Sequence, residues 1–190
     1  LLYMKELIIK ENEAGQRFDK YLAKVLKDLP EGYEHLSFFE DKFVRMAKAV
    51  ACLQQPEGYW TRSMMDPEHA PGPETSGTAF FTYGMLWGIN NGYLDKDEFM
   101  PVVEKAWKYL TKTALQKDWS VGYVQPIGEK AIPGQVVDAK STANFGVGAF
   151  LLAACEYVRY LEANNNETRK YWTDMAYRMA AVSYTHLRAH

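Results

Sequence analysis

The chain has 190 residues, of which 47% are hydrophobic and 14% aromatic, enough for one globular domain with a sizeable core. Its 22 basic and 24 acidic residues give a net charge of -2 without a polybasic block, so residues 27–182 are not expected to bind nucleic acid, and a small-molecule partner is favoured. No segment approaches the roughly 20 uninterrupted apolar residues of a membrane span, and the N-terminus lacks the pattern of a signal peptide. We therefore expect a soluble, cytoplasmic protein without a membrane partner.

The first residues differ in pattern from the rest of the chain. The stretch MKELIIKENEAGQRFDKYLAKVL, residues 4–26, predicts a short strand, a turn and a helix. It resembles the opening of the small RNA-binding module that precedes many pseudouridine synthases, but the basic second helix of that module, which contacts phosphate, does not follow. Residues 1–26 are therefore either a foreign segment in a chimeric gene or an ordinary strand and helix.

The remaining periodicity predicts helices of two kinds. Three predicted helices are amphipathic: residues 39–53, the helix that begins with a capping box of Asp95 and Glu98, and residues 169–182. Residues 76–91 and 141–161 are apolar almost all round, which is typical of helices surrounded by protein. The apolar face expected for the first helix comprises Phe39, Phe43, Met46, Val50 and Leu53.

The connections alternate as the helices do. Long loops lead into the apolar helices, whereas the return around Gly92 is short. Thr78 and Gly84 match Thr142 and Gly148 at a constant offset (142 − 78 = 64), which indicates a repeat of helical hairpins. Stacked hairpins whose inner helices have no free face close into a double-layered ring, so the predicted fold class is all-α.

Closure of such a ring puts both long loops on one rim, at the N-terminal ends of the inner helices. Glu74 and Ser76 occupy rim positions equivalent to those of Asp138, Ser141 and Thr142. Polar side chains and helix N-terminal amides can build a pocket there, which makes these five residues candidates for substrate binding. Capping alone remains an alternative for Ser76 and Ser141, whereas for Glu74 we favour a functional role.

The first long loop offers two further candidates for substrate binding. Trp60 can present a flat face to a sugar ring, and Arg62 can meet a carboxylate with its planar fork. Packing of the loop is the alternative for Trp60, and a solvated charge is the alternative for Arg62. Asp66 is interpreted as a turn residue and His69 as a loop residue. The second long loop is lined by Trp119, Tyr123 and Gln125.

Cysteine and histidine placement does not predict a metal site. Cys52 and Cys155 lie in apolar helical patterns far apart, which favours buried free thiols. His186 and His190 belong to SYTHLRAH, residues 183–190, which interrupts the helical period and reads like translated adapter DNA, so they carry no functional weight. We expect no metal and no cofactor.

Four stretches together carry a specific resemblance. LQQPEGYW, PETSGTAFFTYGMLWGINNGYL, GYVQPIG and STANFGVGAFLLAACE resemble the C-terminal part of glycoside hydrolase families 105 and 88. The resemblance implies a six-hairpin α/α barrel, of which residues 27–182 would be an incomplete part. It also implies removal of an unsaturated uronic acid from pectin-derived rhamnogalacturonan oligosaccharides, with an Asp that protonates the ring double bond and then helps water add to it.

The chain departs from these families before residue 26. The catalytic Asp and the Trp-x-Arg-Gly-x-Gly-Trp stretch should precede the helix that ends near Leu26, and neither is present. We therefore assign no catalytic residue and expect an inactive fragment of a hydrolase. The alternatives are a non-catalytic helical-hairpin protein that binds carbohydrate or acts as a scaffold, and an RNA-binding segment of a pseudouridine synthase, which depends on residues 4–26 alone.

Overall fold

The computed structural model describes residues 36–128, 131–164 and 168–188. The chain divides into two compact units, Leu1–Phe39 and Glu40–His190, and the second contains the helical core. The predictions for residues 1–26 and for His190 lie outside the described residues.

The described residues form helices connected by loops. These are α2 (Leu36–Ala51), α3 (Thr75–Asn90), α4 (Lys96–Tyr109), a short π-helical turn η2 (Leu110–Ala114), α5 (Asn144–Ala163) and α6 (Arg169–Arg188). Extended pairing within the described ranges is limited to two isolated bridges, Trp60 with Glu74 and Leu115 with Val121. The all-α prediction is confirmed.

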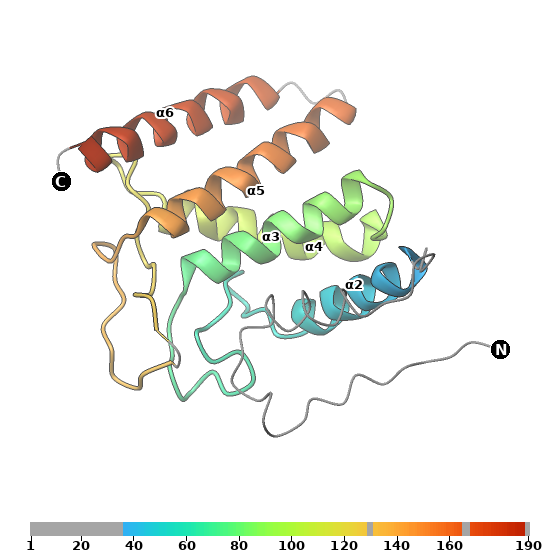
Figure 1. The fold of residues 1–190 in the computed structure, drawn as a ribbon, viewed down its shortest axis with the longest axis horizontal. Helices are drawn as coiled ribbons and strands as arrows, with labels where there is room; N and C mark the ends of the chain where they lie inside the picture. Colours follow the sequence, from blue (N-terminus) through green and yellow to red (C-terminus); the bar gives the residue numbers. More distant parts are fainter. Residues whose placement is uncertain (1–35, 129–130, 165–167, 189–190) are drawn as a thin grey trace, which may run out of the picture. The chain divides into compact units, whose positions relative to one another are not determined.

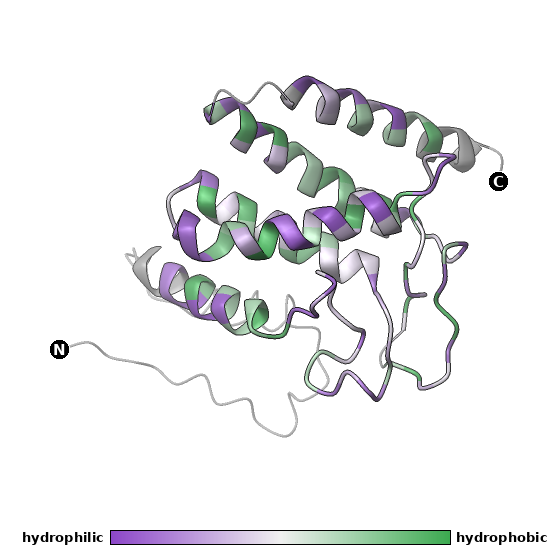
Figure 2. Cartoon of the chain, turned by 180° about the vertical axis from the view of Figure 1, so that it is seen from behind, coloured by the Kyte–Doolittle hydropathy of each residue, from purple (hydrophilic) through white to green (hydrophobic). Residues whose placement is uncertain are grey.

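Helices α3 and α5 pack side by side, and each also contacts the helix that follows it, α4 or α6 (Figure 1). This is the predicted arrangement of inner and outer helices in hairpins. Viewed from behind, α4 and α6 carry polar residues along their outer surfaces (Figure 2). The burial of one stripe on each amphipathic helix therefore holds the two layers together.

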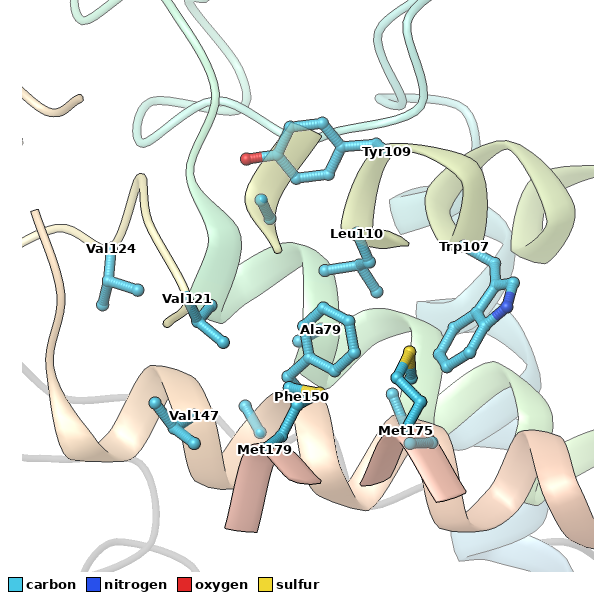
Figure 3. Packing of buried hydrophobic residues seen from close by; sticks show 14 residues of the cluster. Ala79, Trp107, Tyr109, Leu110, Val121, Val124, Val147, Phe150, Met175 and Met179 are labelled. Carbon is cyan, nitrogen blue, oxygen red and sulfur yellow. The ribbon is translucent and has the colours of Figure 1, made fainter. Parts of the chain in front are cut away.

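Aromatic and thioether side chains fill the space between α4, α5 and α6. Trp107 stacks on Tyr157 with ring centroids 4.5 Å apart, and Phe150 lies 5.8 Å from the same indole. Met175 and Met179 close this cluster from α6 (Figure 3). Each of these rings buries a large apolar area, so the cluster stabilises the packing of α5 and α6 on each other and on α4.

The inner helices are less completely covered than their sequences predict. Phe80 and Trp87 on α3 are 47% and 36% exposed, and Leu152 on α5 is 44% exposed. The polar Thr78 and Thr82 are buried instead, because each donates its hydroxyl hydrogen to the carbonyl four residues earlier, at 2.7 Å. The described elements pack against only part of each helix surface, which leaves an apolar face open.

Several helix boundaries and burial predictions are corrected. Helix α2 ends at Ala51, and its buried face centres on Ala47, whereas Met46 is 58% exposed. Helix α6 continues to Arg188, where an interruption after residue 182 was expected. Cys52, in the turn after α2, and Cys155 on α5 are free as predicted, but both are exposed where burial was expected.

Candidate functional site

Two long loops, residues 52–74 and 115–143, gather at the end of the helix pair where α3 and α5 begin (Figure 1). This is the rim predicted from the sequence. The hydrogen bonds that build it centre on Glu74 and Thr75, at the start of α3.

Glu74 is the N-cap of α3 and is only 3% exposed. Its Oε1 accepts hydrogen bonds from Ser76 N at 2.9 Å and Ser76 Oγ at 2.8 Å, and its Oε2 accepts one from Gly77 N at 2.6 Å. Oε1 also accepts from Gln125 N, 3.2 Å away in the second long loop. The buried carboxylate thus satisfies the free amides of the first helical turn and ties the other loop to it.

Thr75 continues this junction one residue later. Its backbone N–H donates to Tyr123 O at 2.8 Å, and its hydroxyl donates to Gly122 O at 2.8 Å. Because that hydroxyl hydrogen is used, the 2.8 Å contact between Thr75 Oγ1 and Tyr109 Oη has Tyr109 as the donor. Burial raises the pKa of Tyr109 above its ordinary value, and the nearby Glu74 carboxylate adds to this shift, so the phenol stays protonated.

The second long loop reaches α3 through a strained segment. Tyr123 has a φ of 59°, in the left-handed region that side chains other than glycine rarely adopt. Its N–H donates to Asp138 O at 2.7 Å, and the next residue, Val124, donates to Ser141 O at 2.8 Å. A side chain at Gly122 would collide with the backbone of Ala139. Close backbone approach to residues 138–141 therefore fixes this part of the rim.

Asp138 and Ser141 form a turn of their own before α5. Asp138 Oδ1 accepts from Lys140 N at 2.8 Å, from Ser141 N at 3.1 Å and from Ser141 Oγ at 3.2 Å. The Lys140 backbone N–H is the main reason that the pKa of Asp138 lies below its usual value. Asp138 and Thr142 are exposed.

The predicted equivalence of the two rim positions is therefore only partial. Helix α5 begins at Asn144, and its N-cap, Ala143, makes no side-chain hydrogen bond. Ser141 and Thr142 precede the helix, in contrast to the prediction that it begins at residue 141. The offset of 64 residues aligns the sequences but not the helix starts.

Trp60 lies in the core beneath the rim. The residue is 1% exposed, its indole N–H donates to Val50 O at 2.8 Å, and its ring meets that of Phe81 edge-on at 5.3 Å. Its backbone N–H donates to Thr78 Oγ1 at 3.1 Å. These contacts correspond to the packing alternative and leave no ring face open for a sugar in this structure.

Arg62 lies at the surface of the rim, half-buried between the two loops. Its Nη1 and Nη2 donate to Gln135 Oε1 at 3.0 Å and to Gln135 O at 3.1 Å. A longer bond joins Nη1 to Ile132 O at 3.4 Å. Most of the fork is thus bound to the second loop, and contact with a substrate carboxylate stays a prediction.

The structure brings Trp60, Glu74 and Ser76 together and connects them to Asp138 and Ser141 through residues 122–125. Sequence reasoning placed Thr75 on the rim beside Glu74 but missed its hydrogen bonds and the role of Tyr109, because a tyrosine near a helix end looks ordinary. Among the described residues, no three His, Cys, Asp or Glu side chains gather as a metal site would require. No described helix is long and apolar enough to cross a membrane.

Comparison with known sequences identifies relatives of this arrangement. The chain matches Glycosyl Hydrolase Family 88 over residues 20–161. The unsaturated 3S-rhamnoglycuronyl hydrolase of Formosa agariphila is 41% identical over 141 residues, covering 74% of this chain and 36% of that protein. A protein of the same name from Alteromonas sp. (strain LOR) is 39% identical over 135 residues, covering 71% of this chain and 32% of that protein. The chain thus spans about a third of these relatives.

Solved structures agree with this assignment. One named polysaccharide lyase is 73% identical with a TM-score of 0.65, covering 74% of this chain and 40% of its own. A glycosyl hydrolase family 88 structure from Bacteroides vulgatus is 67% identical with a TM-score of 0.65, covering 73% of this chain and 40% of its own. A possible GH105 member from Salmonella enterica, 23% identical with a TM-score of 0.59 over 72% of this chain and 35% of its own, shares the fold. Because the family match spans most of the chain, including the whole rim, this chain belongs to glycosyl hydrolase family 88.

Proposed function

We propose that this chain is the C-terminal part of a hydrolase that removes unsaturated uronic acid from rhamnogalacturonan oligosaccharides. The observation that carries the proposal is the 41% identity to an unsaturated 3S-rhamnoglycuronyl hydrolase over a region that includes both long loops. The rim at the start of α3 and α5 is then one wall of the substrate pocket.

The chemistry is hydration of the vinyl ether in the unsaturated ring. A carboxylic acid protonates the double bond and its carboxylate then helps water to add, so that the ring opens. No residue of this chain is assigned that role. We therefore propose that the chain alone binds but does not turn over its substrate.

The exposed polar residues before α5 are the proposed contacts with sugar hydroxyls. Asp138 uses one carboxylate oxygen in its turn, and Thr142 carries its hydroxyl at the surface. Glu74, Ser76 and Trp60 are buried, so their proposed contribution is to hold the loops in place from beneath. Hydroxyl recognition of this kind suits an oligosaccharide, whose rings present many donors and acceptors.

Ultraviolet absorbance of the double bond separates the proposal from a lyase, and calorimetric binding separates it from a carbohydrate-binding or scaffold protein. A hydrolase consumes the double bond, whereas the lyase activity that one relative's name indicates would create it. The purified chain is incubated with an unsaturated rhamnogalacturonan disaccharide and, separately, with intact rhamnogalacturonan. We expect no change in either, together with disaccharide binding detected by calorimetry.

Falling absorbance that survives purification would show that the chain holds its own proton donor. Rising absorbance with the intact polymer would favour a lyase. Binding of intact rhamnogalacturonan without preference for the unsaturated end would favour the carbohydrate-binding or scaffold alternative. The RNA-binding interpretation of residues 4–26 and the cytoplasmic location stay predictions.

A further inference from the structure

A tight turn in the second long loop, Ile132 to Gln135, is set by its own sequence. Gln135 N donates to Ile132 O at 3.3 Å, and Gly134 has a φ of 74°. Pro133 precedes that glycine and has its φ fixed by its ring. Proline followed by a left-handed glycine is typical of a type II turn, so little further ordering is needed to hold this conformation.

Arg62 of the first long loop donates hydrogen bonds to both ends of this turn. The three distances reported above join its guanidinium to Ile132 O, Gln135 O and Gln135 Oε1. All three acceptors are uncharged, and two are backbone carbonyls. A planar fork with several N–H groups can reach them together, whereas the single ammonium of a lysine could not match their spacing.

We propose that Arg62 is a positioning residue that clamps the Ile132–Gln135 turn and thereby fixes the second loop against the first at the rim. The consequence of this clamp is a fixed wall in the pocket that would bind an unsaturated uronyl oligosaccharide. That part of the inference rests on the proposed function. The clamp gives Arg62 a role distinct from direct contact with the substrate carboxylate.

Gly134 offers a way to separate the clamp from direct contact. A Cβ added there meets no atom within 4 Å, so the expected effect of Gly134→Val is on the backbone conformation. A β-branched residue strongly disfavours the positive φ of this position. The substitution therefore disturbs the turn while it leaves the Arg62 side chain intact and freer to meet a ligand.

Hydrogen exchange tests the clamp without a ligand. In the 190-residue chain, Arg62→Ala should raise the exchange rate of the Gln135 amide roughly fivefold, because local opening then breaks fewer hydrogen bonds. Arg62→Lys should give an intermediate rate. Arg45→Ala is the matched control, since Arg45 is exposed and pairs only with Asp41 at 3.8 Å in the described structure. An unchanged Gln135 rate in Arg62→Ala would overturn the clamp.

Calorimetric titration with an unsaturated rhamnogalacturonan disaccharide tests its role in the pocket. Arg62→Ala and Gly134→Val should each weaken binding by roughly tenfold, and the double variant should lose no more than either alone, because both changes free the same turn. Thermal unfolding midpoints should stay near that of the wild type.

The remaining outcomes are distinct. If Arg62→Ala abolishes binding while Gly134→Val binds as the wild type does, Arg62 contacts the sugar directly; the clamp's role is then overturned and the proposed function stands. If the wild-type chain does not bind the disaccharide, the proposed function and the pocket role of the clamp both fail, whatever the exchange rates show.

Discussion

The starts of α3 and α5 carry the same sequence pattern but are built in different ways. At α3, the Glu74 carboxylate is buried, caps the helix directly and binds a residue of the other loop. At α5, Asp138 is exposed and closes a separate turn before the helix, whose N-cap makes no side-chain bond. The repeat thus places an acidic residue at both starts, while burial gives the two carboxylates unequal surroundings.

The difference follows from what surrounds each carboxylate. Glu74 is buried together with two of its donors, Ser76 N and Ser76 Oγ, which would be left without a partner if the carboxylate were lost. Water can replace the partners of Asp138 because that side chain is exposed. The equivalent carboxylates are therefore buried in hydrogen bonds at one start and exposed at the other.

Amide substitutions should show the largest contrast between the two starts. Glu74→Gln should lower the free energy of unfolding by about 3 kcal/mol, because both carboxylate oxygens accept hydrogen bonds and the new NH₂ must face a donor. Asp138→Asn should leave the midpoint nearly unchanged, since the hydrogen bonds of its turn in the described structure use only Oδ1, which an amide oxygen can replace. Urea titrations of both variants measure this, and equal midpoints would remove the contrast.

Threonine substitutions should give a smaller contrast of the same sign. Thr75→Val leaves the Tyr109 hydroxyl and Gly122 O without their buried partner, which should cost about 2 kcal/mol of stability. Thr142→Val is the matched control at the exposed position and should cost less than about 0.5 kcal/mol. A comparable loss in both denaturation curves would mean that the hydroxyl network around Thr75 is not what holds the rim.

The pH dependence of stability should report the burial of Tyr109. Its folded pKa is raised, chiefly by burial, whereas in the unfolded chain it ionises near its ordinary value of about 10. The unfolded state therefore loses the proton first, so this contribution is complete below about pH 10 and is lost as the pH rises above it.

Tyr109→Phe cannot ionise and supplies the reference. Above about pH 10, the stability of the wild type relative to Tyr109→Phe should fall by about 1.4 kcal/mol per pH unit. Urea titrations at several pH values measure the difference. A difference that does not change with pH would mean that Tyr109 ionises equally in both states.

Glycine substitutions in the middle of the helices should give the smallest effects and no contrast. An added Cβ at Gly84 of α3 or Gly148 of α5 meets no atom within 4 Å. Each change to Ala should stabilise the chain by about 0.5–1 kcal/mol through the lower helix propensity of glycine. Gly146→Ala is the destabilising control, because its Cβ would collide with Val124. If one of these two substitutions stabilised the chain and the other destabilised it, the two inner helices would differ at their middles as well as at their starts.

The sequence by itself determined the helices and their pairing. Apolar spacing located the starts of α3, α4, α5 and α6 to within a few residues, since a helix that packs on one or more sides must repeat its apolar residues every three or four positions. The resemblance to the hydrolase family could also be recognised from the sequence, because the glycines and other small residues of its motifs occur at fixed spacing. Capping of α4 by Asp95 was correct for the same local reason.

Tertiary structure decided which polar residues are buried and which loops meet. No local sequence pattern predicts the hydrogen bonds from Gln125 to Glu74 and from Tyr109 to Thr75. The same is true of the hydrogen bonds from Arg62 to a turn that begins 70 residues further along the chain. Such contacts depend on how the long loops fold back over the helix ends, and loop conformation is set by backbone hydrogen bonds whose partners are distant in sequence. The sequence could therefore place candidates on a rim, but only the packing of that rim separated the residues that support it from those exposed to a ligand.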